Sequence, residues 1–173
     1  MKSLKYIIAG LICAIVMNNT AQAMGEKTIV EIAVGSKDHT TLVAALKAAD
    51  LVTTLSGKGP FTVFAPTNAA FAKIPADALA NLLKPENKAT LAGILTYHVV
   101  AGNIDAATLT SLIKKSKGTA VVKTVNGQEL KASIENGKVV LTDANGGKAT
   151  VITADLKGSN GVIHATDAVS MPK

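Results

Sequence analysis

Hydrophobic residues in the first half of the chain recur three or four positions apart, which is the spacing of one face of an α-helix. Residues 40–49 show this pattern, and Asp38 or Thr40 is available to cap the start of that helix. Pro75 and Asp105 are suited to begin further helices. The pattern predicts helices that bury Leu79, Leu82, Leu83, Leu91, Ile94, Leu95, Leu109, Leu112 and Ile113.

One apolar strand interrupts these helices at residues 61–65. Pro66 ends the strand, because proline has no N–H group to continue a hydrogen-bonded ladder. Thr67 then follows as an N-cap for a short helix at residues 68–73. The first half of the chain is therefore predicted to be helical, with a single strand inserted.

After Lys117 the pattern becomes the two-residue alternation of β-strands. Between residues 129 and 135, Leu130, Ala132 and Ile134 alternate with polar residues, so one face of that strand is predicted to be in water. Asn-Gly pairs recur about every ten residues, and this dipeptide is typical of two-residue hairpin turns with positive φ. We expect hairpins at 126–127, 136–137 and 145–146 that connect strands at 120–125, 129–135, 138–142 and 148–153.

A last strand at residues 162–166 is almost wholly apolar, which predicts a central position in the sheet. Together the elements predict an α+β domain in which antiparallel strands pack as a compact sandwich or wedge. The helices of the first half are expected to cover one side of it. No repeat or linker divides the chain, so one domain is predicted.

The N-terminal residues have the organisation of a secretory signal peptide. Lys2 and Lys5 precede an apolar segment at residues 6–17, which is shorter than the roughly 20 residues that a membrane span needs. A small-residue motif, Ala21-Gln22-Ala23, follows. Cleavage after Ala23 is predicted, with residues 1–23 as the signal peptide and residues 24–173 as a single domain that is secreted or periplasmic.

Composition limits the partners that the domain is expected to bind. The predicted signal peptide contains two of the 18 basic residues and none of the 12 acidic ones, so cleavage lowers the formal net charge from +6 to +4. All the basic residues are lysines, whereas arginine is the usual bidentate ligand of phosphates and bases. The lysines are scattered apart from Lys114, Lys115 and Lys117, which suit the end of a helix. No nucleic-acid partner is predicted.

Motifs for catalysis and cofactor binding are absent from the sequence. Residues 158–161 contain a serine between glycines but not at the spacing of a nucleophile elbow. His39, His98 and His164 lie far apart, without metal-ligand spacing. His164 and Asp167 are three positions apart on a strand, so they point to opposite faces. The sequence predicts no enzyme, no catalytic residues, no cofactor and no metal site.

Two segments and a dipeptide between them resemble the fasciclin domain family, also called FAS1 or beta-Ig-H3. The segments are residues 59–71 (GPFTVFAPTNAAF) and 160–167 (NGVIHATD), and Tyr97-His98 lies between them. The resemblance extends from Thr28 to Pro172. Within the family, the chain is similar to a bacterial, secreted, single-domain member. It implies the FAS1 fold and a function in cell adhesion or in binding a protein, cell-surface or matrix partner, and not in catalysis.

The resemblance also implies binding residues. Tyr97 and His98 match a Tyr-His pair implicated in integrin binding by animal members, and Asp155-Leu156 matches a second motif. Each has an alternative interpretation from the residues alone. His98 is a candidate structural histidine because it begins an apolar strand, and Asp155 is a candidate cap for a turn before Asn160.

Some proteins similar to this family bind carotenoids, so the second functional hypothesis is a soluble carrier of an apolar molecule.

Overall fold

The computed structural model describes residues 27–173, so the predicted signal peptide and its cleavage site lie outside the described residues. The helices are α1 Ile29–Gly35, α2 Thr40–Ala48, α3 Val52–Leu55, α4 Asn68–Phe71, α5 Ala76–Leu82, α6 Lys88–Tyr97 and α7 Ala106–Lys115, with 3₁₀ turns at Lys37–His39 and Pro85–Asn87. The strands are β1 Phe61–Pro66, β2 Val99–Ala101, β3 Thr119–Lys123, β4 Glu129–Glu135, β5 Lys138–Thr142, β6 Lys148–Gly158 and β7 Gly161–Thr166. The α+β prediction is confirmed.

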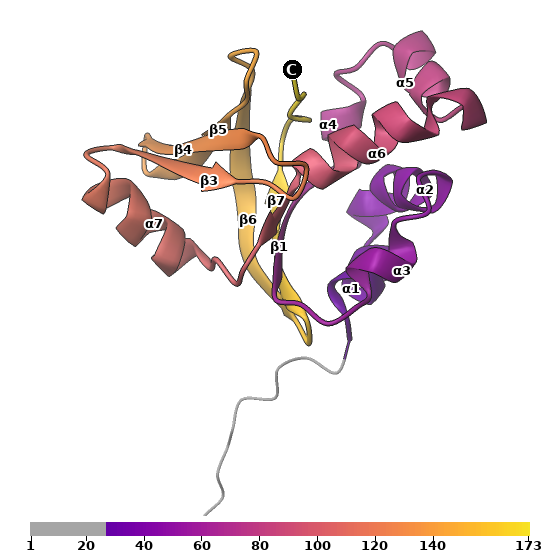
Figure 1. The fold of residues 1–173 in the computed structure, drawn as a ribbon. Coiled ribbons are helices and arrows are strands. Elements are labelled where there is room, and N and C mark those ends of the chain that lie inside the picture. The colour runs from indigo at the N-terminus through magenta and orange to yellow at the C-terminus, as the bar shows by residue number, and fades with distance from the viewer. Residues whose placement is uncertain (1–26) are drawn as a thin grey trace, which may run out of the picture.

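The strands form one sheet in the order β2-β1-β7-β6-β5-β4-β3. Its neighbours pair antiparallel except β1 and β7, which are parallel, so the expectation of a purely antiparallel sheet is wrong at that pair. The two edge strands approach each other, since Val100 bridges to Thr124 and the Val125 N–H donates to the Val99 carbonyl at 2.7 Å. The sheet is thereby folded into a wedge (Figure 1).

The wedge separates two hydrophobic cores. Helices α1 to α6 lie on one side, as predicted, but the expectation that all the helices cover that side is wrong for α7, which lies apart from them beside β3 and β4 (Figure 1). Successive side chains of β1 contribute to different cores. Val63 and Ala65 pack with the helices, whereas Phe64 packs inside the wedge with α7. All six residues of β7 are buried between β1 and β6, so its predicted central position is confirmed.

Helix starts show where local sequence signals were sufficient. Thr67 and Asp105 cap α4 and α7 as predicted. The cap predicted for α2 is wrong, because His39 occupies that position without a side-chain cap bond. Instead, the side-chain oxygen of Asn68 accepts hydrogen bonds from the Thr41 N–H at 3.0 Å and the Thr40 hydroxyl at 3.2 Å. A residue 27 positions away thus takes the role that was assigned to a neighbour.

Helix α1 was not predicted, although its sequence signal is present. Thr28 and Glu31 form a capping box, in which the Thr28 hydroxyl accepts from the Glu31 N–H and the Glu31 carboxylate accepts from the Thr28 N–H. The Thr28 hydroxyl also donates to the Glu31 carboxylate at 2.9 Å, and the two bonds that this carboxylate accepts, from the Thr28 N–H and hydroxyl, lower the pKa of Glu31. In the sheet, Leu130 and Ala132 are buried as expected, but Ile134 is 39% exposed because the end of β4 extends past the core.

The Asn-Gly turns divide into two kinds. Asn136 and Gly137 have φ of 52° and 76° and join Glu135 directly to Lys138, which confirms a two-residue turn. At 126–127 and 145–146 only the glycine has positive φ. There the hydrogen bonds from Thr124 N–H to Gln128 and from Asp143 N–H to Gly147 close three-residue loops. The two-residue prediction is wrong at these hairpins, because their side chains stabilise a wider loop.

We expect Gly137→Val to lower the free energy of unfolding by at least about 1 kcal/mol, because a β-branched residue resists positive φ. No heavy atom lies within 4 Å of a Cβ built on Gly137, so the loss is conformational and not steric. The measurement is the midpoint of chemical denaturation. Gly137→Asn is the matched control, since asparagine tolerates this conformation. Equal midpoints for the valine and asparagine proteins would contradict the prediction.

Candidate functional site

Tyr97 is an interior residue at the end of α6. Its side chain is fully buried. The hydroxyl donates to the Glu129 carbonyl at 3.0 Å and accepts from the Ala144 N–H at 3.1 Å, so both of its hydrogen-bonding roles are filled. Burial raises the pKa of this phenol above its usual value. Tyr97 therefore joins α6 to β4 and to the loop after β5.

His98 is equally enclosed, with 2% of its surface exposed. Its Nδ1 lies 2.8 Å from the Ile94 carbonyl, and its Nε2 accepts from the Ser170 N–H at 3.0 Å. These partners require a neutral imidazole with its proton on Nδ1. Burial lowers the pKa of His98, while the nearby Asp143 carboxylate acts against that shift. The geometry matches the structural interpretation, and a binding role for Tyr97 and His98 stays a prediction.

Asp143 completes the arrangement that holds the last residues of the chain. Its carboxylate accepts from the N–H groups of Asn145, Gly147 and Met171 at 2.7 to 2.9 Å. With His98 bound to Ser170, two buried side chains fix residues 170 and 171 against α6 and the loop after β5.

We expect the stability of the domain to fall as pH decreases below about 6.5. The unfolded chain protonates His98 near its ordinary pKa, whereas the folded protein keeps it neutral to lower pH, so the unfolded state binds more protons in that range. His39, whose pKa is also lowered by burial, acts in the same direction. The measurement is the free energy of unfolding against pH.

His98→Ala tests the assignment. It should destabilise the domain by roughly 1 to 3 kcal/mol near neutral pH, because the Ile94 carbonyl and Ser170 N–H lose their partner. The same variant should also flatten the pH dependence. A His98→Ala protein with an unchanged unfolding curve that no longer binds its partner would instead identify a partner-facing role.

Asp155 and Leu156 lie on an irregular part of β6, where the pairing with β7 shifts register between Thr153 and Leu156. Asp155 is exposed and has a φ of 60°. Its carboxylate accepts from the Ala106 N–H at 2.8 Å, so it binds the first residue of α7. The expectation that Asp155 caps a turn before Asn160 is therefore wrong. Leu156 is half-buried and packs against the helical core.

Asp105 and His164 lie close to Asp155 and also form hydrogen bonds near the start of α7. Asp105 accepts from the Thr108 N–H at 2.7 Å, and hydrogen bonding with the side chain and the N–H of Thr108 lowers the pKa of the Asp105 carboxyl. His164 Nε2 lies 2.8 Å from the Ile104 carbonyl, and its Nδ1 accepts from the Asp155 N–H at 3.4 Å. Asp167 lies just after the end of β7 and accepts from the Thr150 N–H, so His164 and Asp167 bind different partners. These bonds position the segment that leads into α7.

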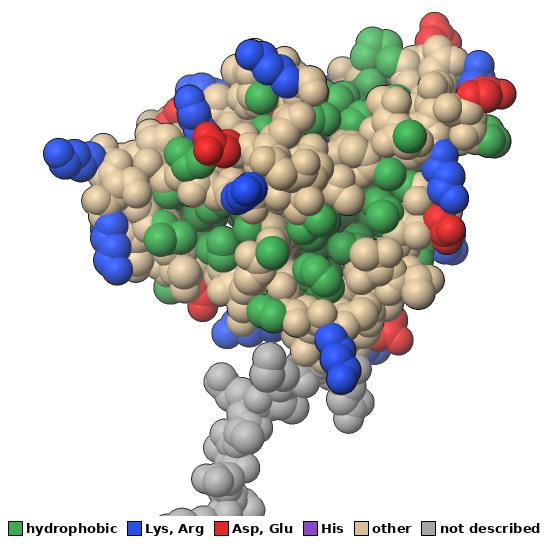
Figure 2. Space-filling model, in the orientation of Figure 1, with side chains coloured by type: hydrophobic (Ala, Val, Ile, Leu, Met, Phe, Trp, Pro, Cys, Tyr) green, Lys and Arg blue, Asp and Glu red, His purple; other side chains and the backbone are tan. Residues whose placement is uncertain are grey.

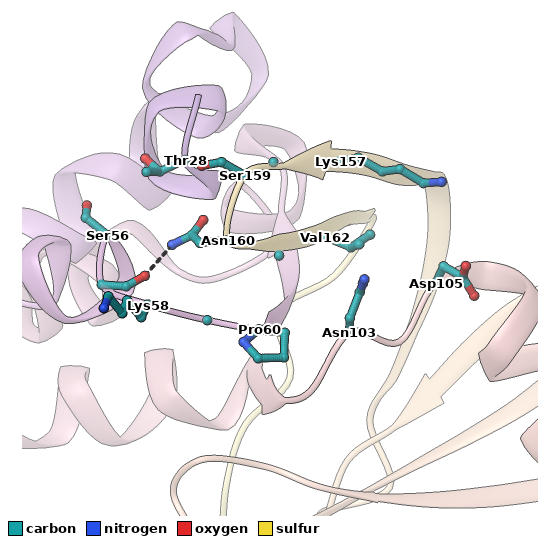
Figure 3. Close-up of a pocket in the computed structure, with 14 residues that line it drawn as sticks. Thr28, Ser56, Lys58, Pro60, Asn103, Asp105, Lys157, Ser159, Asn160 and Val162 are labelled. Atoms are coloured by element: carbon teal, nitrogen blue, oxygen red, sulfur yellow. Dashed lines mark hydrogen bonds between the residues drawn. The ribbon is translucent and has the colours of Figure 1, made fainter. Parts of the chain in front are cut away.

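A cleft of about 590 Å³ opens beside this segment, at the end of β1 and β7 (Figure 3). Both segments that resemble the family meet there, since Pro60 lines it from one and Asn160 from the other. The Asn160 side chain donates to the carbonyls of Leu55 at 2.8 Å and Gly57 at 2.9 Å, and accepts from the Ile29 N–H at 2.9 Å. One carboxamide thus joins β7 to α1 and to the end of α3.

Comparison with known proteins assigns the family. A model of the Fasciclin domain matches residues 37–172. The chain belongs to the fasciclin domain family. This fasciclin domain is 52% identical over 145 residues to Protein sll1483 of Synechocystis sp., covering 84% of this chain and 73% of that protein. It is 34% identical over 158 residues to Immunogenic protein MPB70 of Mycobacterium bovis, covering 88% of this chain and 73% of that protein.

The fold is that of a solved FAS1 structure. The FAS1 domain pair from the insect cell adhesion molecule Fasciclin I superposes with a TM-score of 0.74 at 20% identity. The match covers 84% of this chain, and the chain spans about half the length of that domain pair. The predicted FAS1 fold is therefore confirmed.

The cleft of this fasciclin domain is polar around its rim. Lys58 and Lys157 lie near its opposite ends, with Asn103 and Asp105 on the side that leads to α7 (Figure 3). Among residues 27–173, neither lysine has a carboxylate oxygen within 4.0 Å. Ammonium, hydroxyl and amide groups in this arrangement are suited to bind a polar or acidic group of a partner.

Sequence reasoning missed this cleft, because it is assembled from loops that are distant in the chain. The sequence feature that marks the cleft is the Asn160-Gly161 pair, but by itself this pair predicts only a turn. Within the described part of the chain, no group of three or more His, Cys, Asp or Glu residues is placed to hold a metal ion. No helix among residues 27–173 has the length and apolar character needed to cross a membrane.

Proposed function

We propose that this fasciclin domain is an exported interaction module that binds a protein, cell-surface or matrix partner and so mediates adhesion. The observation that carries the proposal is the exposed cleft where the two family segments meet, in which no carboxylate oxygen of residues 27–173 lies within 4.0 Å of the Lys58 or Lys157 ammonium group. The structural relative is named a cell adhesion molecule, which supports the same class of function. Export is inferred from the N-terminal pattern alone.

Of the residues that the resemblance implies, Asp155 and Leu156 are better placed for contact than Tyr97 and His98. Asp155 is exposed, and the next residue but one, Lys157, lines the cleft. Tyr97 and His98 are buried, so direct contact would require the chain around Ser170 to move. We therefore propose that Asp155 and Leu156 extend the binding surface and that Tyr97 and His98 support it from inside.

Charged side chains are dispersed on one face of the molecule. On the face shown in Figure 2, lysine side chains stand apart from one another, and uncharged side chains occupy the lower middle. A surface of this kind supports a local contact at the cleft more than a broad electrostatic one.

The carrier hypothesis has less support. The apolar cavity between α1, α2 and β1 has a volume of only about 10 Å³, about the space of one water molecule. Its walls are the buried aliphatic side chains of the helical core, including Leu42 and Val63. An elongated apolar ligand would need the core to repack or would have to bind at the surface. We therefore place the adhesion function first.

The proposal is tested by the binding of the purified domain to surface and matrix material from the cells that produce it. The double variant Lys58→Ala, Lys157→Ala should bind at least about tenfold more weakly, because it removes both ammonium groups from the cleft. The double variant Lys114→Ala, Lys115→Ala is the matched control, with the same change in charge at the end of α7. Both proteins should unfold like the parent.

Two outcomes would count against the proposal in different ways. Equal loss of binding in both double variants would show a general charge effect and exclude the cleft as the contact site. A parent domain that binds neither cells nor matrix material would contradict the adhesion function itself.

A further inference from the structure

Four Asn-Gly dipeptides occur in the described part of the chain, beginning at Asn126, Asn136, Asn145 and Asn160. Asparagine followed by glycine is chemically labile, because glycine has no side chain to hinder attack of its backbone nitrogen on the asparagine carboxamide. Whether the attack occurs depends on the freedom of the two residues to bring those atoms together. The structure gives the four sites very different freedom.

Three of the sites are held by side-chain hydrogen bonds. The Asn126 oxygen accepts from the Gln128 N–H and the Thr124 hydroxyl, and its nitrogen donates to Gly93. The Asn145 nitrogen donates to the carbonyls of Met171 and Pro172. Asn160 makes the three bonds described above, which join β7 to two helices.

The attacking nitrogen is also engaged at two of these sites. The Gly127 N–H donates to the Thr124 carbonyl at 2.9 Å, and the Gly146 N–H donates to the Asp143 carbonyl at 3.1 Å. At the third, Gly161 is buried against the backbone of Phe61. Reaction at any of the three therefore requires local opening of the structure.

Asn136 differs from the other three sites in its hydrogen bonding, although Asn145 and Gly146 are exposed in a hairpin loop as well. It lies at the tip of the hairpin between β4 and β5, and both Asn136 and Gly137 are exposed. Among residues 27–173, neither the Asn136 carboxamide nor the Gly137 N–H has a hydrogen-bond partner.

We propose that Asn136 is a site of spontaneous deamidation in the folded protein. The backbone nitrogen of Gly137 loses its proton and attacks Cγ of Asn136, forming a C–N bond. The C–Nδ2 bond breaks, and the nitrogen leaves with that proton as ammonia, which yields a five-membered succinimide. Water then adds to one of the two ring carbonyls and opens the ring to aspartate or isoaspartate.

The product changes both charge and geometry at the end of the sheet. A new carboxylate is created next to Glu135, whose side chain is paired with the Lys148 ammonium at 2.7 Å. Isoaspartate also adds one atom to the main chain within a two-residue turn, which the pairing of Glu135 with Lys138 does not accommodate. Modification at Asn136 therefore alters the outer end of β4 and β5, remote from the cleft.

The test is prolonged incubation of the folded domain near neutral pH, followed by peptide mapping with mass spectrometry. Each product is detected by the replacement of –NH₂ by –OH, and isoaspartate is assigned by fragmentation. Asn136 is expected to react at least about tenfold faster than Asn126, Asn145 or Asn160, because each of those must first break two or more hydrogen bonds.

Incubation in denaturant is the control for sequence effects. There the four sites share the same dipeptide and no tertiary contacts, so their rates should converge. The proposal is supported if the four deamidation rates are similar in denaturant and the rate at Asn136 is the highest in the folded protein. It is overturned if Asn136 stays intact in the folded domain while the unfolded chain reacts, or if another of the four sites reacts first.

Discussion

Gly161→Ala is expected to destabilise this fasciclin domain by about 3 kcal/mol or to prevent its folding, because there is no space for a methyl group at this position. A Cβ on Gly161 would lie 2.0 Å from the Phe61 carbonyl oxygen and 2.9 Å from its carbon. Both are backbone atoms of the buried parallel pair β1 and β7, in which Phe61 and Gly161 are direct partners. Rotation of a side chain therefore does not relieve the contact.

The measurement is the free energy of unfolding by chemical denaturation, with Gly93→Ala as the matched control. Gly93 lies within α6, and no heavy atom lies within 4 Å of its Cβ position. Alanine there should stabilise the protein by about 0.5 to 1 kcal/mol, because it is a better helix former. If the two alanine proteins had the same midpoint, the close approach of β1 and β7 would be excluded as a constraint.

Asn160→Ala is expected to lower the free energy of unfolding by about 2 to 4 kcal/mol, since three hydrogen bonds of about 1 kcal/mol each are lost. The Ile29 N–H and the carbonyls of Leu55 and Gly57 all lose their partner together. Amide hydrogen exchange gives a specific second measurement. The Ile29 amide should exchange faster in the variant, because this carboxamide holds the first turn of α1 to β7.

Asn81→Ala provides the control for removing an asparagine. Asn81 is exposed on α5, and alanine is the better helix former there, so a neutral or slightly favourable effect is expected. Similar losses from the Asn160 and Asn81 variants, or an unchanged exchange rate at Ile29, would falsify the role assigned to Asn160.

Local chemistry made much of the fold predictable. The predicted bounds of β4 and β5 agree with the structure, since alternation and the Asn136-Gly137 turn act over only a few residues. Thr67 and Asp105 were correct as caps for the same reason, because each bonds a backbone N–H three positions ahead. The resemblance carried by residues 59–71 and 160–167 gave the family, which the family model confirms.

Other features depend on contacts that cross the chain. The oxygen that caps α2 belongs to Asn68, and the carboxylate that binds the first residue of α7 belongs to Asp155, 49 positions away. The spacing of residues in the sequence does not indicate which distant side chain will accept a hydrogen bond from the start of a helix. The site predictions were limited in the same way, because Tyr97 and His98 can be recognised as a pair in the sequence, whereas their burial depends on β4 and on Ser170.

Short-range spacing and the signature segments were enough to predict the helices with clear apolar faces, the hairpin meander, the central apolar strand and the family. The parallel pairing of β1 with β7, the enclosure of His98 and the cleft beside Lys58 and Lys157 are visible only in the folded protein. All three depend on packing between segments that are distant in the chain, and at Gly59 and Gly161 two segments about a hundred residues apart approach closely enough to exclude even a Cβ atom.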